Sequence, residues 1–401
     1  MKPAVMFDMF GPYHLARLNA LGNRYPTLGI EISSRSATYD WVPMQVEARF
    51  ERRTLFDVRD SSELSTGQID GALAAELDRF QPDVVLVPGW TSRAALCMLR
   101  WSLRRGIPSV LMSESTRRDR VRRDWRETLK RRVIANFGAG LVGGKPQKEY
   151  LVELGMAHEF IAMGFDVVDN TYFSQSAEAI RANAGDLRAE AGLPERYVLA
   201  SARFIPIKGL LGLVEAFGRF RRLRPTSQTH LVLLGDGPER PALEAKRAEL
   251  GLNNAIVMPG FEQYERLPTY YALADAFLHV SRSEPWGLVV NEAMAAGLPV
   301  VVSNACGCAS DLVQDGGNGY VVAHNDLDEI ADRLARIDDD PGLRARMAVR
   351  SSTIIAKWGP DRFADGAIEA ASMAQRHGAQ PHGLGARILL AHLHSVSVRK
   401  P

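Results

Sequence analysis

The sequence predicts an α/β protein with two parallel-sheet domains. Short apolar runs at residues 4–10, 82–90 and 107–112 alternate with helix-forming segments, and residues 69–80 repeat apolar side chains at helical spacing. Such alternation is typical of βαβ units, whose successive strands lie parallel in one sheet. The chain has 401 residues, which is enough for two domains of ~100–200 residues each.

The composition is that of an ordinary soluble protein, with 46% hydrophobic and 24% charged residues. The formal net charge of +2 gives no reason to expect a polyanion as the partner. Cys97, Cys306 and Cys308 have no metal-ligand spacing and suggest a reducing compartment. Asp8 comes too early for a signal peptide, and no apolar run approaches the ~18 residues of a membrane span. We therefore expect a cytoplasmic protein.

The most informative stretch joins an apolar run at residues 276–280 to a helix-forming segment that begins near Gly287. In an open α/β sheet such a strand-to-helix junction lies in the crevice where ligands bind. The first N–H groups of the helix, those of Gly287, Leu288 and Val289, suit a phosphate because they have no intrahelical partner and lie at the positive end of the helix dipole.

Two glutamates flank this anion site. Glu284 lies in the preceding loop, and Glu292 lies inside the helix on the face shared with Leu288. They would offer acceptors for hydroxyl groups on both sides of a phosphate, which fits a sugar, a diphosphate and a ribose. The alternative is a loop carboxylate and a solvated helix residue, and the two glutamates alone leave both interpretations open.

The wider pattern resembles the signature of family 4 (group 1) retaining glycosyltransferases with the GT-B fold. The resemblance is strong from about residue 198 to residue 358 and weaker before. It is carried by Glu284, Pro285, Gly287, Glu292, Ala293 and the run Gly297, Leu298, Pro299 and Val300. It implies two Rossmann-like parallel-sheet domains that face each other across a cleft, with a C-terminal helix that crosses back. It also implies that Glu284 contacts the donor sugar and Glu292 the ribose.

On this basis we divide the chain into four parts. Residues 1–170 form an acceptor-side Rossmann-like domain and residues 171–360 a nucleotide-sugar-binding domain. Residues 361–375 form the crossover helix, and residues 376–401 a flexible tail.

Further donor contacts follow from the resemblance. Arg203 and Lys208 match the family's two cations that clamp the donor diphosphate, and fixed cations there stabilise the charge that grows on the leaving nucleotide. The alternative is two solvated basic residues. Gly235 and Asp236 lie in the glycine-rich turn that in relatives lies beside the nucleotide, where glycine permits close backbone approach.

The acceptor side is less well defined. Gly11 lies where the family usually has a Gly-Gly loop against the donor, and His14 follows it at the start of the next helix. Glu114 lies where many relatives carry a histidine that contacts the donor sugar. We treat His14 and Glu114 as acceptor-side candidates. The alternatives are a structural histidine and an acid at a helix N-terminus.

Residues 117–132 contain nine Arg or Lys and three Asp or Glu, with a narrow apolar stripe. They are expected to form a surface helix packed on the sheet, or a patch for an anionic membrane or a pyrophosphate-linked acceptor. Nucleic acid is not expected, because no reading motif accompanies the helix. Residues 138–143 match G-x-G-x-x-G but follow a helix, which argues against an oxidoreductase. Asp338, Asp339 and Asp340 are read as a solvated loop.

These observations predict a retaining enzyme that moves a hexosyl unit from a nucleotide diphosphate sugar to a sugar or lipid-linked acceptor in cell-surface polysaccharide or glycolipid biosynthesis. The resemblance implies no cofactor and no obligatory metal. We expect a cytoplasmic protein, with peripheral attachment to the inner face of the membrane if the basic helix binds lipid. The alternatives are a GT-B epimerase or phosphorylase, and a sugar-nucleotide-binding protein without catalysis.

Overall fold

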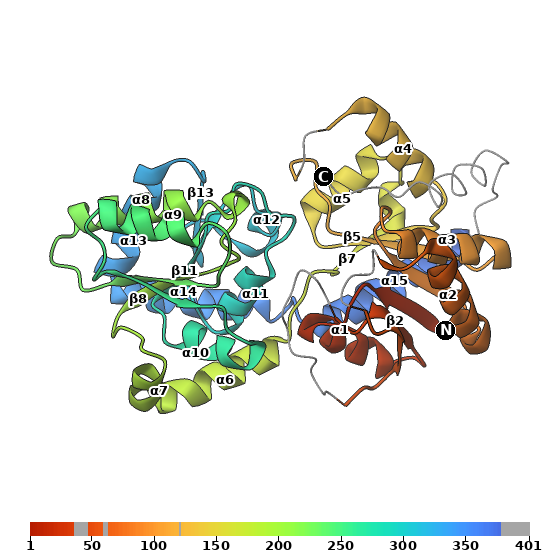
Figure 1. The fold of residues 1–401 in the computed structure, drawn as a ribbon, viewed down its shortest axis with the longest axis horizontal. Coiled ribbons are helices and arrows are strands. Elements are labelled where there is room, and N and C mark those ends of the chain that lie inside the picture. The colour runs from red at the N-terminus through yellow and green to blue at the C-terminus, as the bar shows by residue number, and fades with distance from the viewer. Residues whose placement is uncertain (36–46, 59–62, 120–121, 378–401) are drawn as a thin grey trace. The chain divides into compact units, whose positions relative to one another are not determined.

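The computed structural model describes residues 1–35, 47–58, 63–119 and 122–377. The chain forms two compact units (Figure 1). Unit 1 combines Met1–Val167 with the segment that begins at Pro360, and unit 2 is Val168–Gly359. The predicted flexible tail lies outside the described residues from residue 378 onwards.

Unit 1 contains a seven-stranded parallel sheet in the order β3-β2-β1-β4-β5-β6-β7. Because β2 and β4 pair with opposite edges of β1, the strand order reverses between β1 and β4. The strands are β1 Pro3–Phe7, β2 Leu28–Ser33, β3 Glu51–Phe56, β4 Val84–Pro88, β5 Ser109–Ser113, β6 Ala139–Val142 and β7 Ile161–Met163.

The helices of unit 1 include one from the far end of the chain. They are α1 Pro12–Gly22, α2 Thr66–Phe80, α3 Arg93–Arg105, α4 Asp124–Ile134, α5 Lys145–Glu153, η2 His158–Phe160 and α15 Pro360–His377. Helix α15 packs on α1 and on β4, β5, β6 and β7 through a face of small side chains. A Cβ at Gly366 would lie 2.5 Å from the Met163 carbonyl oxygen, so glycine is required for this close approach. The predicted return of the C-terminal helix to the first sheet is thus confirmed.

Unit 2 contains a six-stranded parallel sheet in the order β10-β9-β8-β11-β12-β13. Its order reverses between β8 and β11, in the same way as in unit 1. The strands are β8 Tyr197–Ser201, β9 His230–Leu234, β10 Ile256–Gly260, β11 Ala276–His279, β12 Val300–Ser303 and β13 Gly319–Val322. The prediction of two Rossmann-like parallel-sheet domains is therefore confirmed.

The helices of unit 2 cover this sheet, whose strands are apolar and largely buried except for the edge strand β10. They are α6 Asn170–Ala182, α7 Ala184–Glu190, η3 Pro206–Lys208, α8 Leu210–Leu223, α9 Arg240–Glu249, η4 Tyr264–Arg266, α10 Leu267–Ala272, α11 Leu288–Ala295, α12 Ala309–Leu312, α13 Leu327–Asp339 and α14 Pro341–Ile355. Helices α6 and α7 are separate because Asn183, which lies between them, leaves the helical conformation.

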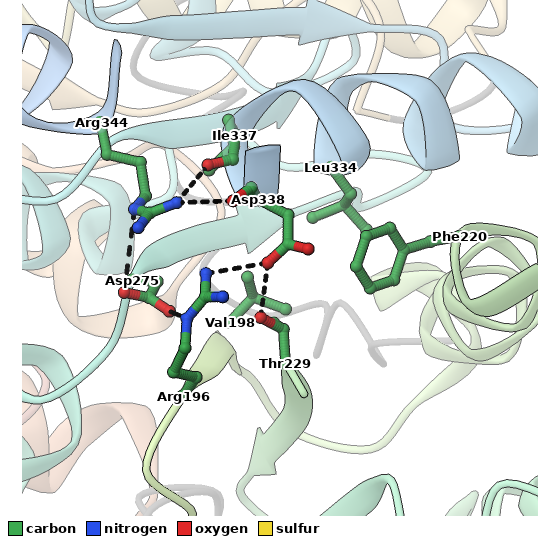
Figure 2. A pocket seen from close by; sticks show the side chains of 9 residues that line it. All are labelled: Arg196, Val198, Phe220, Thr229, Asp275, Leu334, Ile337, Asp338 and Arg344. Atoms are coloured by element: carbon green, nitrogen blue, oxygen red, sulfur yellow. Dashed lines mark hydrogen bonds and ion pairs between the residues drawn. The ribbon is translucent and has the colours of Figure 1, made fainter. Parts of the chain in front are cut away.

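A network of ion pairs ties the amino ends of β8, β9 and β11 to α13 and α14 (Figure 2). Arg196 pairs with Asp275 at 3.2 Å and with Asp338 at 2.9 Å, and Thr229 donates to Asp338 at 2.6 Å. Arg344 donates to two backbone carbonyls at the end of α13. The interpretation of Asp338 as solvated is wrong, because its side chain is 8% exposed and its Oδ1 accepts hydrogen bonds from Arg196 and Thr229.

Candidate donor site in unit 2

Two loops at the carboxyl ends of β8 and β11 bring together residues that are far apart in sequence. The strand order reverses between these two strands, and at such a point a parallel sheet leaves a crevice for ligands. Lys208 ends η3 after β8, and Glu284 lies in the loop after β11. The Lys208 ammonium forms an ion pair with Glu284 Oε2.

His279, the last residue of β11, is a second partner of the same carboxylate. Its side chain is 4% exposed, and Nε2 lies 3.1 Å from Glu284 Oε2 and 3.3 Å from Ser281 Oγ. The Glu284 backbone is also fixed, because its N–H donates to Ala305 at 3.2 Å and its carbonyl accepts from Gly307 at 2.9 Å. Among the described residues, none donates a hydrogen bond to Glu284 Oε1.

The electrostatics of Glu284 keep it ionised. Burial would raise the pKa of this carboxyl group, but the hydrogen bond and charge of His279, together with the charge of Lys208, outweigh burial and lower the pKa to about 2. Glu284 is therefore a carboxylate at neutral pH, and its Oε1 can accept a hydrogen bond.

Gly287 links this cluster to helix α11. It caps the helix in the left-handed region, at φ +105°, which glycine adopts readily. A Cβ at this position would lie 3.4 Å from both Glu284 Cγ and the His279 ring. The next residues, Leu288 and Val289, are partly exposed in the first turn of α11. The predicted anion position thus lies at a helix N-terminus beside Glu284.

Glu292 lies one turn further along α11. It is 1% exposed, and its Oε2 accepts a hydrogen bond of 2.6 Å from the Tyr271 hydroxyl. Burial and the charge of Glu292 raise the pKa of Tyr271 well above its usual value, so the phenol keeps its proton. The interpretation of Glu292 as a solvated helix residue is wrong, and its ribose contact stays a prediction.

The turn after β9 approaches the loop after β8 very closely. Gly235 has φ +127°, and a Cβ there would lie 2.0 Å from the Ala202 carbonyl oxygen. Asp236 pairs with Arg240 at 2.9 Å, and the hydrogen bond from Arg240 lowers the pKa of Asp236. Arg203 is exposed, and no described residue accepts a hydrogen bond from its guanidinium. Of the two predicted cations, only Lys208 is anchored.

The acceptor-side candidates belong to unit 1. The Gly11 N–H donates to His14 Nδ1 at 3.0 Å, and the His14 ring packs on Phe7. Burial and the charge of Arg17 lower the pKa of His14 to about 3, so the neutral ring carries its proton on Nε2. The Gly11 N–H is used in this bond, and the contact of Gly11 with the donor stays a prediction. Glu114 is exposed, just after β5.

No group of three or more His, Cys, Asp or Glu in the described part of the chain could hold a metal ion. Within the same residues, every helix is too short or too polar to cross a bilayer.

Comparison with known proteins identifies the second unit. Residues 186–352 match the family described as Glycosyl transferases group 1. Unit 2 is a group 1 glycosyltransferase domain. The matched residues include all six strands of the unit 2 sheet, β8 to β13, and contain Lys208, Glu284 and Glu292.

Curated relatives of this glycosyltransferase domain align over part of their length. The alpha-D-kanosaminyltransferase of Streptomyces kanamyceticus is 34% identical over 176 residues, which is 44% of this chain and 45% of the relative. The GDP-mannose-dependent alpha-(1-6)-phosphatidylinositol monomannoside mannosyltransferase of Mycolicibacterium smegmatis is 33% identical over 180 residues, 41% of this chain and 46% of the relative. The chain thus spans less than half the length of these two relatives.

Solved structures resemble the chain over both units. Anabaena HepE, crystallised with UDP and glucose, has a TM-score of 0.68 at 20% identity and covers 93% of this chain and 99% of its own. At this identity the likeness shows the fold, which is the predicted GT-B architecture.

Two side chains that contact the predicted glutamates were not predicted from the sequence: His279, beside Glu284, and Tyr271, beside Glu292. His279 is a polar residue at the end of an otherwise apolar strand, and that exception was a usable signal. Tyr271 gave no signal, because nothing in its own segment indicates that it lies against Glu292.

Proposed function

We propose that the protein is a retaining glycosyltransferase that moves a hexosyl unit from a nucleotide diphosphate sugar to an acceptor. The observation that carries the proposal is the Lys208–Glu284 pair at the reversal point of the unit 2 sheet, beside the N-terminus of α11. The solved structure of HepE with UDP and glucose supports a nucleotide-sugar donor.

In this proposal each residue of the site binds a different part of the donor. Lys208, with Arg203, would hold the diphosphate together with the first N–H groups of α11. Glu284 Oε1 would accept a hydrogen bond from a sugar hydroxyl, and Glu292 would bind the ribose. The cations stabilise the transition state more than the ground state, because negative charge grows on the diphosphate as the bond to the sugar breaks.

The chemical step needs no protein base. The bond from the anomeric carbon to the phosphate oxygen breaks, and the nucleoside diphosphate leaves with the electron pair. The acceptor oxygen forms the new bond on the same face of the sugar, and its proton passes to the departing phosphate oxygen. We expect no obligatory metal ion.

The test replaces Lys208 or Glu284 with Ala and measures transfer with a panel of sugar nucleotides. Each variant should lose about 10²–10³-fold in kcat/KM, as is usual when one preorganised stabilising group is removed. Lys246→Ala and Glu249→Ala are the matched controls, because these residues pair with each other on α9. Near wild-type transfer by both test variants would overturn the site assignment.

Product analysis separates the alternatives. Release of a nucleoside diphosphate with a glycosylated acceptor is the expected result. An altered sugar on the intact nucleotide would show an epimerase, and release of a sugar phosphate a phosphorylase. Donor binding without any product would show a binding protein.

The acceptor side points to a lipid-linked substrate on an anionic membrane. Exposed basic residues gather before and along α4, around Trp125, which is 61% exposed. We call this set the α4 surface: Arg117, Arg118, Arg123, Trp125, Arg126, Arg131 and Arg132. An exposed aromatic ring among arginines suits the interface of an anionic bilayer. The mycobacterial relative is named for a phosphatidylinositol mannoside substrate, which supports this choice. Such an enzyme would act in glycolipid or cell-surface polysaccharide synthesis, at the inner face of the membrane.

A further inference from the structure

The carboxylate of Glu284 has two cationic or donating neighbours on one oxygen and none on the other. Lys208 and the His279 ring both contact Oε2, whereas no described residue donates to Oε1. We propose that His279 is a positioning residue, which fixes Glu284 so that Oε1 stays turned to the donor sugar. This inference rests on the proposed role of Glu284 in sugar binding.

Lys208 cannot hold Glu284 and the diphosphate equally well. When its ammonium turns to the phosphates, Glu284 loses that ion pair inside a site where its side chain is only 14% exposed. A buried carboxylate without a hydrogen-bond partner is strongly destabilised. Of the described side chains around Glu284, His279 is the partner that remains, and it stays because it ends a buried strand.

The surroundings of His279 fix the ring. His279 ends strand β11, and its backbone is held in the sheet by its pairing with Val302 of β12. The ring lies parallel to that of Phe277, at an interplanar angle of 13°. The Cys306 thiol donates to the His279 carbonyl at 3.7 Å. Since Gly287 has no Cβ, the ring and the carboxylate share the space beside it.

The contact also dictates a proton position. A carboxylate only accepts, so the bond to Glu284 requires a proton on His279 Nε2. Ser281 Oγ, at 3.3 Å from the same nitrogen, can share that proton. A histidine that merely filled the strand end would be free to carry its proton on Nδ1.

The first experiment needs no ligand. NMR of the full-length protein with ¹⁵N-labelled histidine reads the protonation of Nε2 directly. We expect a protonated Nε2 whose signal shifts in Glu284→Gln and stays unchanged in Glu249→Gln. A neutral ring with its proton on Nδ1 would overturn the proposal, whatever the protein binds.

The second experiment compares affinities. A donor is chosen by thermal shift from UDP- and GDP-sugars, and its nucleoside diphosphate serves as the sugar-free ligand. His279→Leu should weaken the sugar nucleotide ~10-fold, the value of about one hydrogen bond, and leave the diphosphate within about twofold. His279→Gln keeps a donor and should recover part of the loss. His230→Leu, at the amino end of β9 in the same sheet, is the control.

The outcomes are distinguishable. Equal weakening of both ligands, or of neither, would assign His279 a purely structural role and overturn the proposal. If no sugar nucleotide stabilises the wild type, the proposed function fails, and the NMR experiment still decides the His279–Glu284 contact.

Discussion

At the scale of single residues, the donor site depends on how one carboxylate is held. Glu284 is nearly buried, yet the His279 hydrogen bond and the Lys208 charge keep its pKa at about 2. In the proposed function, this ion pair occupies the cation that would hold the diphosphate. Donor binding would then exchange one anion for another at Lys208.

The depressed pKa predicts a specific pH dependence of stability. The folded-state pKa of Glu284 lies below its usual 4.5, so its stabilising contribution is present above pH 4.5 and is lost as the pH falls through about 2. The shift corresponds to at most ~3 kcal/mol. Urea unfolding from pH 6 to pH 2 should show the wild type losing more stability than Glu284→Gln. Parallel pH profiles would contradict this account.

Two glycines with positive φ can be compared, Gly251 at φ +67° and Gly235 at φ +127°, and they differ in both backbone strain and surrounding space. Gly235 and Gly251 both have positive φ, but a Cβ at Gly235 would lie 2.0 Å from the Ala202 carbonyl oxygen, whereas none lies within 4 Å at Gly251. Gly251→Ala should cost ~1–2 kcal/mol in unfolding free energy from backbone strain alone. Gly235→Ala should cost ~1–3 kcal/mol more and weaken donor binding, because the turn must move. Thermal unfolding and calorimetry with the donor would measure both effects, and equal costs would refute the argument.

At the scale of elements, the basic residues before and along α4 are of two kinds, those that face unit 1 and those that are exposed. Arg122 and Lys130 face the unit, where they bond to Asp119 and Glu127 and lie over the Tyr150 ring. The residues of the α4 surface are exposed instead. Net charge alone therefore overstates what α4 offers to a membrane.

The α4 surface yields a direct prediction. Arg131→Glu combined with Arg132→Glu should reduce co-sedimentation with anionic vesicles at low salt at least ~10-fold, at about 1 kcal/mol per charge. Arg104→Glu, an exposed residue on α3, is the control and should leave binding unchanged. Equal recovery of the wild type in the supernatant with anionic and neutral vesicles would end the membrane hypothesis.

The order of strands and helices was largely readable from the sequence, because alternating apolar runs and amphipathic segments mark βαβ units. The limits of α4 were not, since Arg117, Arg118, Arg122 and Arg123 continue the basic composition of the helix, whose first residue is Asp124. The contact of Glu292 with Tyr271 and the burial of Asp338 were also beyond reach. Both depend on contacts between segments that are distant in the chain, and the residues near each position in the sequence do not indicate such contacts.

At the scale of the whole molecule, the two ends of the unit 2 sheet carry different kinds of residue. In unit 2 the carboxyl ends of β8 and β11 carry Lys208 and Glu284, and the amino ends carry the network around Asp338 (Figure 2). The two ends should respond differently to substitution, because they share no side chain.

Asp338→Ala tests this separation. It leaves Arg196 with Asp275 as its remaining partner and removes the acceptor of Thr229, so unfolding free energy should fall by ~1–3 kcal/mol. Donor affinity should stay within about twofold. Asp328→Ala removes an exposed pair with Arg219 and should cost at most ~1 kcal/mol. A loss of donor affinity in Asp338→Ala would show that the two ends are coupled.

The return of α15 to the first sheet has a consequence for biosynthesis. Unit 2 is one uninterrupted stretch of chain, whereas the sheet of unit 1 lacks the cover that α15 provides over β4 to β7 until the segment that begins at Pro360 has been made. During translation the ribosome therefore delivers a complete second unit before it delivers a complete first one. A chain that ended before α15 would leave the fold of unit 1 incomplete, although unit 2, which is closer to the truncation, would contain all of its residues.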